Sequence, residues 1–224
     1  MACAFSGALT QLPMSACSST TLSAGCAGHM DRRLLRSSCR QLPPPQPNSP
    51  FLRDGQFLGR GASKSVTARK RNGILVAVMT SLKGDLMQEA KLMMKLSQQP
   101  HQHLLQLIAI EYDASSKASM VAPIARFGSM YDLADHLEFD GMYLSNHHVV
   151  VVVLQVLSAL LHLNSLQINH GDVCGRNVLV FEFDVSDPRA THVRLGDYGE
   201  ARQGQCDLHS VIRLAAELHV LVPR

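Results

Sequence analysis

The chain has 224 residues, a formal net charge of +3 and 46% hydrophobic residues. This composition is typical of a globular protein with one domain or slightly more, and so small a positive charge indicates no nucleic-acid partner. Six cysteines are present, but no CxxC pair occurs, which argues against a zinc site or a disulfide framework. We therefore expect reduced thiols in an intracellular protein.

Residues 1–50 form a leader that differs from the rest of the chain. They are rich in Ser and Arg, contain a single acidic residue, Asp31, and end in the proline-rich stretch QLPPPQPNSP. Such a stretch favours extended polyproline II and cannot form a core. Two interpretations stay open: a disordered tail on a cytoplasmic protein, or an organelle transit peptide, which is also Ser- and Arg-rich and poor in acids.

Residues 51–82 are predicted to form three antiparallel strands, two of them joined by a hairpin at Asn72–Gly73. Helical spacing over 85–97 predicts an amphipathic helix that Pro100 ends. Strands at 104–110 and 119–125 follow, then a turn and helix at GSMYDLADHLE, a long helix at 147–164, a hairpin at 177–199 and a helix at 207–221. Strands that precede helices in this way predict an α+β fold.

The longest apolar run, residues 149–163, belongs to the long predicted helix. It is interrupted by Gln155 and His162 and is too short to span a bilayer. We therefore predict a buried core helix and no membrane span.

The stretch NHGDVCGRNVLV, residues 169–180, carries the clearest chemical signal. Asp172 and Asn177 lie five residues apart in a loop before a strand, and Asp197 follows at the end of a later strand, in GDYGE. A carboxylate such as Asp172 can accept the proton of an attacking hydroxyl, and Asn177 and Asp197 offer the oxygen ligands that Mg²⁺ prefers. This pattern is typical of phosphoryl transfer.

With these motifs the chain resembles the protein kinase superfamily over about residues 52–220. HGDVCGRN resembles the HRD catalytic loop, DYG the DFG motif, LGRGASKSV the glycine-rich loop, QEAKLMMKL helix C and FGSM the turn after the hinge. Arg176, just before Asn177, is closer to the tyrosine-kinase and tyrosine-kinase-like pattern than to the serine/threonine one.

The resemblance implies a protein-kinase-like two-lobed fold over residues 51–224. The small antiparallel-sheet N-lobe would cover about 51–122, and an incomplete, mainly helical C-lobe about 123–224. It also implies ATP and Mg²⁺ as cofactors and a protein as substrate or signalling partner. The implied roles are Asp172 as base, Glu89 as ion-pair glutamate, Asn177 and Asp197 as metal ligands, and Gly59, Gly61, Val66 and Ala77 as the ATP-binding residues.

Three departures from the family pattern weaken the catalytic interpretation. Met79 stands where the phosphate-binding lysine of V-A-I-K is expected, Gly171 replaces the HRD arginine, and only nine residues separate Asp197 from Asp207. The activation segment is therefore missing, and with it the control by activation-loop phosphorylation. The alternative function is a catalytically inactive pseudokinase that acts as a nucleotide-binding or scaffolding module; a truncated gene model also stays open.

The short C-lobe leads to a further expectation about the last predicted helix. Without the lower helices that cover it in the family, its leucines are expected to be partly exposed, which would promote association. These leucines are Leu214, Leu218 and Leu221.

Lys64 offers a replacement for the missing lysine. Side chains alternate along a strand, so Lys64 shares a face with Val66 and Ala68, and on the neighbouring strand Ala77 and Met79 share that face. An amine at position 64 then reaches the volume that a lysine at 79 would fill, an arrangement similar to that of the with-no-lysine kinases. The competing interpretation is an exposed lysine at a mobile loop tip.

Overall fold

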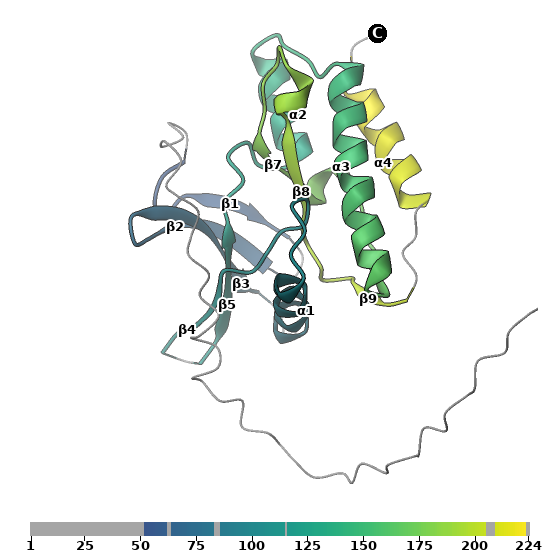
Figure 1. The fold of residues 1–224 in the computed structure, drawn as a ribbon. Helices are drawn as coiled ribbons and strands as arrows, with labels where there is room; N and C mark the ends of the chain where they lie inside the picture. The colour runs from purple at the N-terminus through teal and green to yellow at the C-terminus, as the bar shows by residue number, and fades with distance from the viewer. Residues whose placement is uncertain (1–51, 62–63, 83–85, 115, 205–208, 223–224) are drawn as a thin grey trace, which may run out of the picture. The chain divides into compact units, whose positions relative to one another are not determined.

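The computed structural model describes residues 52–61, 64–82, 86–114, 116–204 and 209–222, which belong to one compact unit. Within these ranges the main strands and helices follow the order that the sequence predicts (Figure 1), but the strand expected at 104–110 forms only at 109–112, and short strands also lie between α3 and α4. The predicted leader at 1–50 lies outside the described residues.

The first part of the unit is a five-stranded antiparallel sheet with strand order β1-β2-β3-β5-β4. The hairpin between β2 and β3 turns at Asn72 and Gly73, whose φ angles of 50° and 84° are left-handed as a two-residue hairpin turn requires. The strands are β1 (Phe57–Arg60), β2 (Lys64–Arg71), β3 (Ile74–Ser81), β4 (Ala109–Tyr112) and β5 (Ala118–Pro123).

Helix α1 (Met87–Gln98) packs its apolar stripe into the same core as one face of the sheet. Ala90, Met93 and Leu96 are each about 1% exposed, and Met79 of β3 belongs to the same cluster. The helix ends before Pro100, as predicted, because proline cannot continue the hydrogen-bond ladder. The sheet face that carries Met79 is thus covered by α1.

The second part of the unit is mainly helical. Two capping boxes begin its first helices: Ser129 with Asp132, and Ser145 with His148. Its helices are α2 (Met130–Phe139), α3 (Asn146–Ser165) and α4 (His209–Val220). Its shorter elements are β6 (Ile168–Asn169), η1 (Gly175–Asn177), β7 (Val178–Glu182), η2 (Pro188–Ala190), β8 (His192–Leu195) and β9 (Arg202–Gln203).

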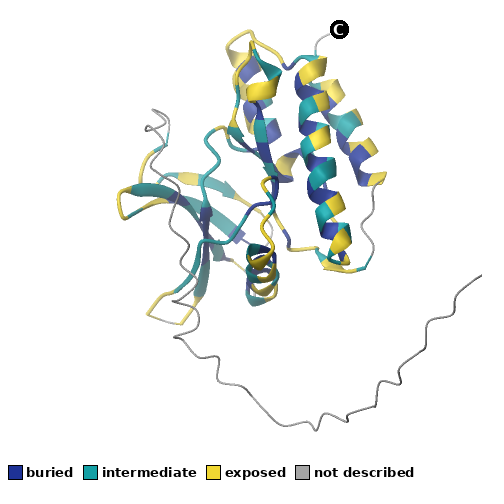
Figure 2. Cartoon of the chain, in the orientation of Figure 1, coloured by how far each residue is buried: buried dark blue, intermediate teal, exposed yellow. Residues whose placement is uncertain are grey.

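Helix α3 is the central helix of this part. It is 20 residues long and, by length and composition alone, the described helix that is apolar enough to cross a membrane. The expectation that its apolar segment is too short therefore does not hold for the complete helix. One face of α3, including Val152, Val156 and Leu160 at 0% exposure, packs toward β8 and α4 (Figure 2). This packing is that of a core helix.

The expected partial exposure is wrong for Leu214 and Leu218 and holds for Leu221. Leu214 and Leu218 are both 0% exposed, because α4 lies beside α3 and directs this face into the core, whereas Leu221, which directly follows α4, is half-buried. The exposed apolar side chains of α4 are instead Ile212 and Val220, on the other face. The short C-lobe therefore still buries the leucine face of its last described helix.

Candidate active site

Lys64 is the first residue of β2, and its side chain points into the molecule. The register pairs Lys64 with Ser81 and Val66 with Met79, so Lys64 and Met79 are diagonal neighbours on one face of the sheet. The Lys64 side chain is only 9% exposed. The structure thus excludes the interpretation of Lys64 as a lysine that extends from the surface.

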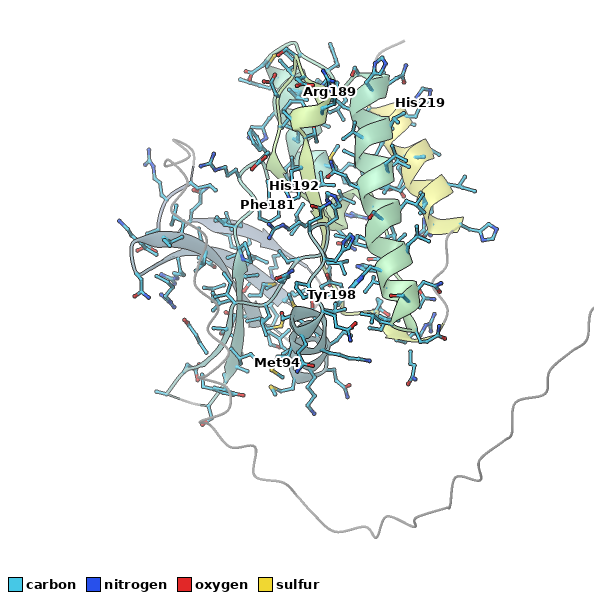
Figure 3. The ribbon with its side chains drawn as sticks, in the orientation of Figure 1. Met94, Phe181, Arg189, His192, Tyr198 and His219 are labelled. Atoms are coloured by element: carbon cyan, nitrogen blue, oxygen red, sulfur yellow. The ribbon has the colours of Figure 1, made fainter. Side chains whose placement is uncertain are left out.

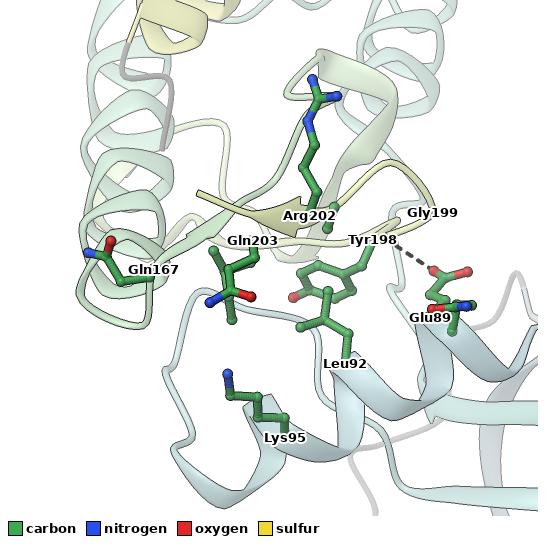
Figure 4. Close-up of a pocket in the computed structure, with 11 residues that line it drawn as sticks. Glu89, Leu92, Lys95, Gln167, Tyr198, Gly199, Arg202 and Gln203 are labelled. Carbon is green, nitrogen blue, oxygen red and sulfur yellow. Dashed lines mark hydrogen bonds between the residues drawn. The ribbon is translucent and has the colours of Figure 1, made fainter. Parts of the chain in front are cut away.

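The Lys64 ammonium joins two carboxylates from different parts of the chain. Its Nζ lies 2.6 Å from Glu89 Oε1 on α1 and 2.7 Å from Asp197 Oδ1, which follows β8. Glu89 is itself 7% exposed, and its Oε1 also accepts the Tyr198 N–H at 3.1 Å (Figure 4). These contacts compensate for the cost of burying the Glu89 carboxylate, whose charge would strongly destabilise the fold if it were unpaired.

Asp197 is held in an unusual backbone conformation. Its φ of 61° is left-handed, which aspartate tolerates better than most residues but which still costs on the order of 1 kcal/mol. The preceding residue, Gly196, is fixed on both sides: its N–H donates to Asn177 O at 2.9 Å and its carbonyl accepts from His170 Nε2 at 3.0 Å. The backbone therefore presents the Asp197 carboxylate, which is 44% exposed, beside Lys64.

The two candidate residues of the loop at 169–177 contact each other directly. Asn177 Nδ2 donates to the Asp172 carbonyl at 2.8 Å and to Asp172 Oδ2 at 2.9 Å. Asn177 is buried, whereas Asp172 is exposed and its carboxylate is open to a substrate. Because both hydrogen bonds use the amide nitrogen, the Asn177 Oδ1 oxygen is left for a cation.

These donors fit a magnesium-bound nucleotide. Asn177 Oδ1 and the exposed Asp197 carboxylate are hard oxygen ligands on backbone segments that the bond from Gly196 to Asn177 ties together. Lys64 adds one ammonium beside them. The set thus combines oxygen ligands for a divalent cation with a cation for a phosphate.

The residues expected to bind ATP surround the start of β2. The Gly61 N–H, directly after β1, donates to Lys64 O at the start of β2 at 2.8 Å. A Cβ added at Gly59 would meet no heavy atom within 4 Å, so the space over this strand is open. Val66 and Ala77 are half-buried on the Lys64 face of the sheet.

Two further residues of the site lie inside the recognised motifs but were not singled out from the sequence. His170 and Tyr198 are both buried, with ring centroids 5.4 Å apart. Burial lowers the pKa of His170, which is therefore neutral; its Nδ1 accepts the Asp172 N–H at 3.4 Å and its Nε2 donates to Gly196 O. Burial raises the pKa of Tyr198, whose hydroxyl contacts the carbonyls of Leu105 and Leu195.

Side chains of α4 hold the loop at 169–177 in place through hydrogen bonds. Arg213 Nη2 donates to Val173 O at 3.1 Å, and the Gly175 N–H donates to Glu217 Oε2 at 3.2 Å. The Tyr131 hydroxyl also donates to Glu217 Oε2, and burial followed by the nearby Glu217 charge raises the pKa of Tyr131. The signal in the sequence was faint: Arg213 and Glu217 lie four residues apart among mostly apolar residues of α4.

The backbone conformation at position 171, where the HRD motif has arginine, requires glycine. Its φ is +82°, and an added Cβ would lie 2.5 Å from the carbonyl oxygen of Glu200. Only glycine adopts this conformation here without displacing the chain. Glycine replaces arginine here because the loop backbone passes close to the Glu200 carbonyl.

Behind Glu89 lies a cavity of about 430 Å³ between α1 and the segments at 167–168 and 198–203 (Figure 4). Leu92 and Lys95 of α1 and Gln203 of β9 contribute to its wall. Glu89 and Tyr198 also line it, so the glutamate that contacts Lys64 borders this cavity.

Comparison with known proteins agrees with this arrangement. A family described as protein tyrosine and serine/threonine kinase matches residues 58–219. Tyrosine-protein kinase Src64B of Drosophila melanogaster is 32% identical over 185 residues, which cover 73% of this chain and 31% of that protein. Tyrosine-protein kinase SRK3 of Spongilla lacustris is 30% identical over 159 residues, which cover 68% of this chain and 44% of that protein.

The chain thus spans less than half the length of these relatives. The family match nevertheless extends from the glycine-rich turn into the last turn of α4 and includes Lys64, Glu89, Asp172, Asn177 and Asp197. The five-stranded sheet, α1 and the incomplete helical part agree with the fold that the family implies. The chain belongs to the protein tyrosine and serine/threonine kinase family.

Proposed function

We propose that this protein binds ATP with Mg²⁺ and transfers the terminal phosphoryl group to a hydroxyl of a protein substrate. The observation that carries the proposal is the position of Lys64, whose ammonium contacts both Glu89 and Asp197 although β3 has methionine at position 79. A lysine held there needs only charge and reach to contact a phosphate. Relocation of the lysine thus supplies what the β3 sequence lacks.

Each of the remaining site residues then has a specific role. Asp172 accepts the proton of the attacking hydroxyl, and its carboxylate is oriented by Asn177 Nδ2 at 2.9 Å. Asn177 and Asp197 would hold Mg²⁺, which neutralises negative charge on the phosphates when it is bound. Glu89 fixes the Lys64 ammonium, and Gly59, Gly61, Val66 and Ala77 border the space for the nucleotide.

One observation favours a second candidate, a nucleotide-binding pseudokinase. Only nine residues separate Asp197 from Asp207, and α4 already begins at His209. A segment this short leaves little chain on which a protein substrate could dock. The pseudokinase would retain Lys64, Asn177 and Asp197 for the nucleotide but transfer no phosphoryl group.

Calorimetric titration of the full chain with ATP, with and without Mg²⁺, tests the shared part of both candidates. We expect binding that requires Mg²⁺ and that Asp197→Asn abolishes, since asparagine also tolerates a positive φ but removes the carboxylate charge. Asp187→Asn is the matched control: Asp187 caps the 3-10 turn η2, its side chain is 50% exposed, and the variant should bind like the native chain. An absence of binding at millimolar ATP would overturn the proposal.

Phosphotransfer separates the two candidates. The chain is incubated with γ-labelled ATP and a peptide mixture that presents serine, threonine and tyrosine, and Asp172→Asn serves as the base-deficient control. Label in peptides that Asp172→Asn fails to produce supports the kinase. Magnesium-dependent ATP binding without any transfer identifies the pseudokinase.

A further inference from the structure

Four histidines form a continuous line of ring contacts where α1 joins the helical part. His101 stacks on His162 of α3 with centroids 5.0 Å apart and 22° between the planes. The edge of His101 meets His103 at 5.7 Å, and His103 contacts His192 of β8 at 5.1 Å. Figure 3 labels His192 beside Phe181, whose ring is 6.3 Å away. The turn after α1 is thus connected to α3 and β8 through imidazole rings.

The hydrogen bonds of His101 specify its protonation state. The His103 backbone N–H donates to His101 Nδ1 at 3.2 Å, so this nitrogen carries no proton. The proton is then on Nε2, which lies 3.2 Å from Ser158 Oγ. Protonation of Nδ1 would place two N–H groups against each other and break the bond to His103. The observed geometry therefore requires a neutral His101.

The same turn is held by bonds that depend on this geometry. His162 Nε2 donates to Gln99 O at 2.9 Å, and the Leu104 N–H donates to His101 O at 3.1 Å. His103 Nδ1 donates to Val193 O at 3.0 Å. Leu104, which directly follows His103, is 1% exposed. Loss of the His101 acceptor would thus loosen the link between the end of α1 and the helical core.

Burial and the neighbouring basic side chains disfavour a positive charge on these histidines. Burial lowers the pKa of His101 most, followed by the proximity of His162 and His103. Burial also lowers the pKa of His192, followed by Arg194 and His103, and Glu182 of β7 opposes this shift. Arg194 itself lies over the Phe181 ring, 4.5 Å from its centroid. Within the described part of the chain, the carboxylate that acts on this line is Glu182, and it acts on His192 rather than on His101.

We propose that His101 is an acid-sensitive latch, which holds the end of α1 on α3 and β8 while it is neutral and releases it when Nδ1 is protonated. The unfolded or opened chain binds this proton at a pH near 6.5, whereas the closed turn disfavours it. The closed turn is therefore most stable above about pH 6.5, and its stability falls as the pH drops below this value. Because α1 carries Glu89, acidification would weaken the support of Lys64.

Hydrogen exchange of the full chain tests the latch without any nucleotide. The peptide 99–105 is followed at pH 7.0 and at pH 5.5, with correction for the intrinsic pH dependence of exchange. We expect corrected exchange to increase by up to about tenfold per pH unit below 6.5, the limit for one linked proton. The β5 peptide 118–123 should not change and serves as the internal control.

Two variants identify the titrating group. His101→Asn keeps an acceptor oxygen near the position of Nδ1 but does not titrate, so the pH-dependent rise should disappear. His147→Asn, an exposed histidine on α3, should leave the rise intact. An undiminished rise in His101→Asn, or no rise in the native chain, would overturn the proposal.

Imidazole nitrogen NMR of the native chain gives an answer that does not depend on the folding of any variant. The expected His101 signals are those of the Nε2–H tautomer at pH 7, with a midpoint below 6.5. A midpoint at or above 6.5, or an Nδ1–H tautomer, contradicts the latch.

Discussion

Exchange of Lys64 and Met79 is the perturbation that bears most directly on the relocated lysine. The double variant Lys64→Met, Met79→Lys moves the ammonium from β2 to the diagonal position on β3. Diagonal neighbours on antiparallel strands are roughly 7–8 Å apart, a distance that a long side chain spans. The lysine would then stand where the family pattern expects it, and ATP binding should be recovered at least in part.

The single variants should be more harmful than the double variant, and their effects on stability and on ATP affinity can be measured separately. Lys64→Met leaves Glu89, 7% exposed, without its cation, and removal of one partner from a buried ion pair costs about 3–5 kcal/mol of stability. Loss of the phosphate contact costs ATP affinity about 1–3 kcal/mol, roughly tenfold to a hundredfold. Adding Glu89→Gln removes the unpaired charge and should restore stability but not affinity. Met79→Lys alone should destabilise, because residue 79 is buried in the apolar core.

Differential scanning calorimetry and ATP titration in the presence of Mg²⁺ measure these two quantities on the same samples. Lys70→Met, an exposed lysine on β2, is the control that should change neither. The reasoning is refuted if Lys64→Met binds ATP like the native chain, or if the exchange of both residues recovers no affinity in a folded protein.

Three further predictions concern the framework of the site. Gly171→Ala should lower stability by at least about 1 kcal/mol in thermal melts, because the new Cβ would meet Glu200 O at 2.5 Å; an unchanged melting temperature would exclude this backbone geometry. Ser145→Ala removes the cap of α3 and should cost about 0.5–2 kcal/mol in denaturant unfolding. Leu214→Ala should cost about 2–5 kcal/mol and the exposed control Ile212→Ala much less; equal costs would contradict the packing of α4.

Local sequence signals predicted the strands β1, β2 and β3 and the face of Lys64, because both depend on neighbours in the chain. The Asn72–Gly73 pair set the hairpin, and the hairpin set the register that pairs Val66 with Met79. Alternation along β2 then placed Lys64 on the same face as Met79. These steps use a period of two residues and one turn, both of which can be read from the sequence.

Contacts between distant segments could not be predicted in this way. The bond from the Tyr198 N–H to Glu89 joins residues 109 positions apart, and the anchoring of the loop by Arg213 and Glu217 depends on how α4 packs. The exposure of Leu214 was predicted wrongly for the same reason: the family comparison indicated missing helices, but the packing of α4 on α3 is a property of the folded core.

Chemical labelling of the lysine beside the phosphates is the most direct test of the central claim. An ATP analogue with an amine-reactive acyl phosphate is added to the full chain with Mg²⁺, and modified peptides are identified by mass spectrometry. The structure predicts acylation of Lys64, which is 9% exposed and lies 2.7 Å from Asp197, and excess ATP should block it. Acylation that is confined to exposed lysines such as Lys70 and Lys91, and that ATP does not block, would contradict the assignment of Lys64 to the phosphates.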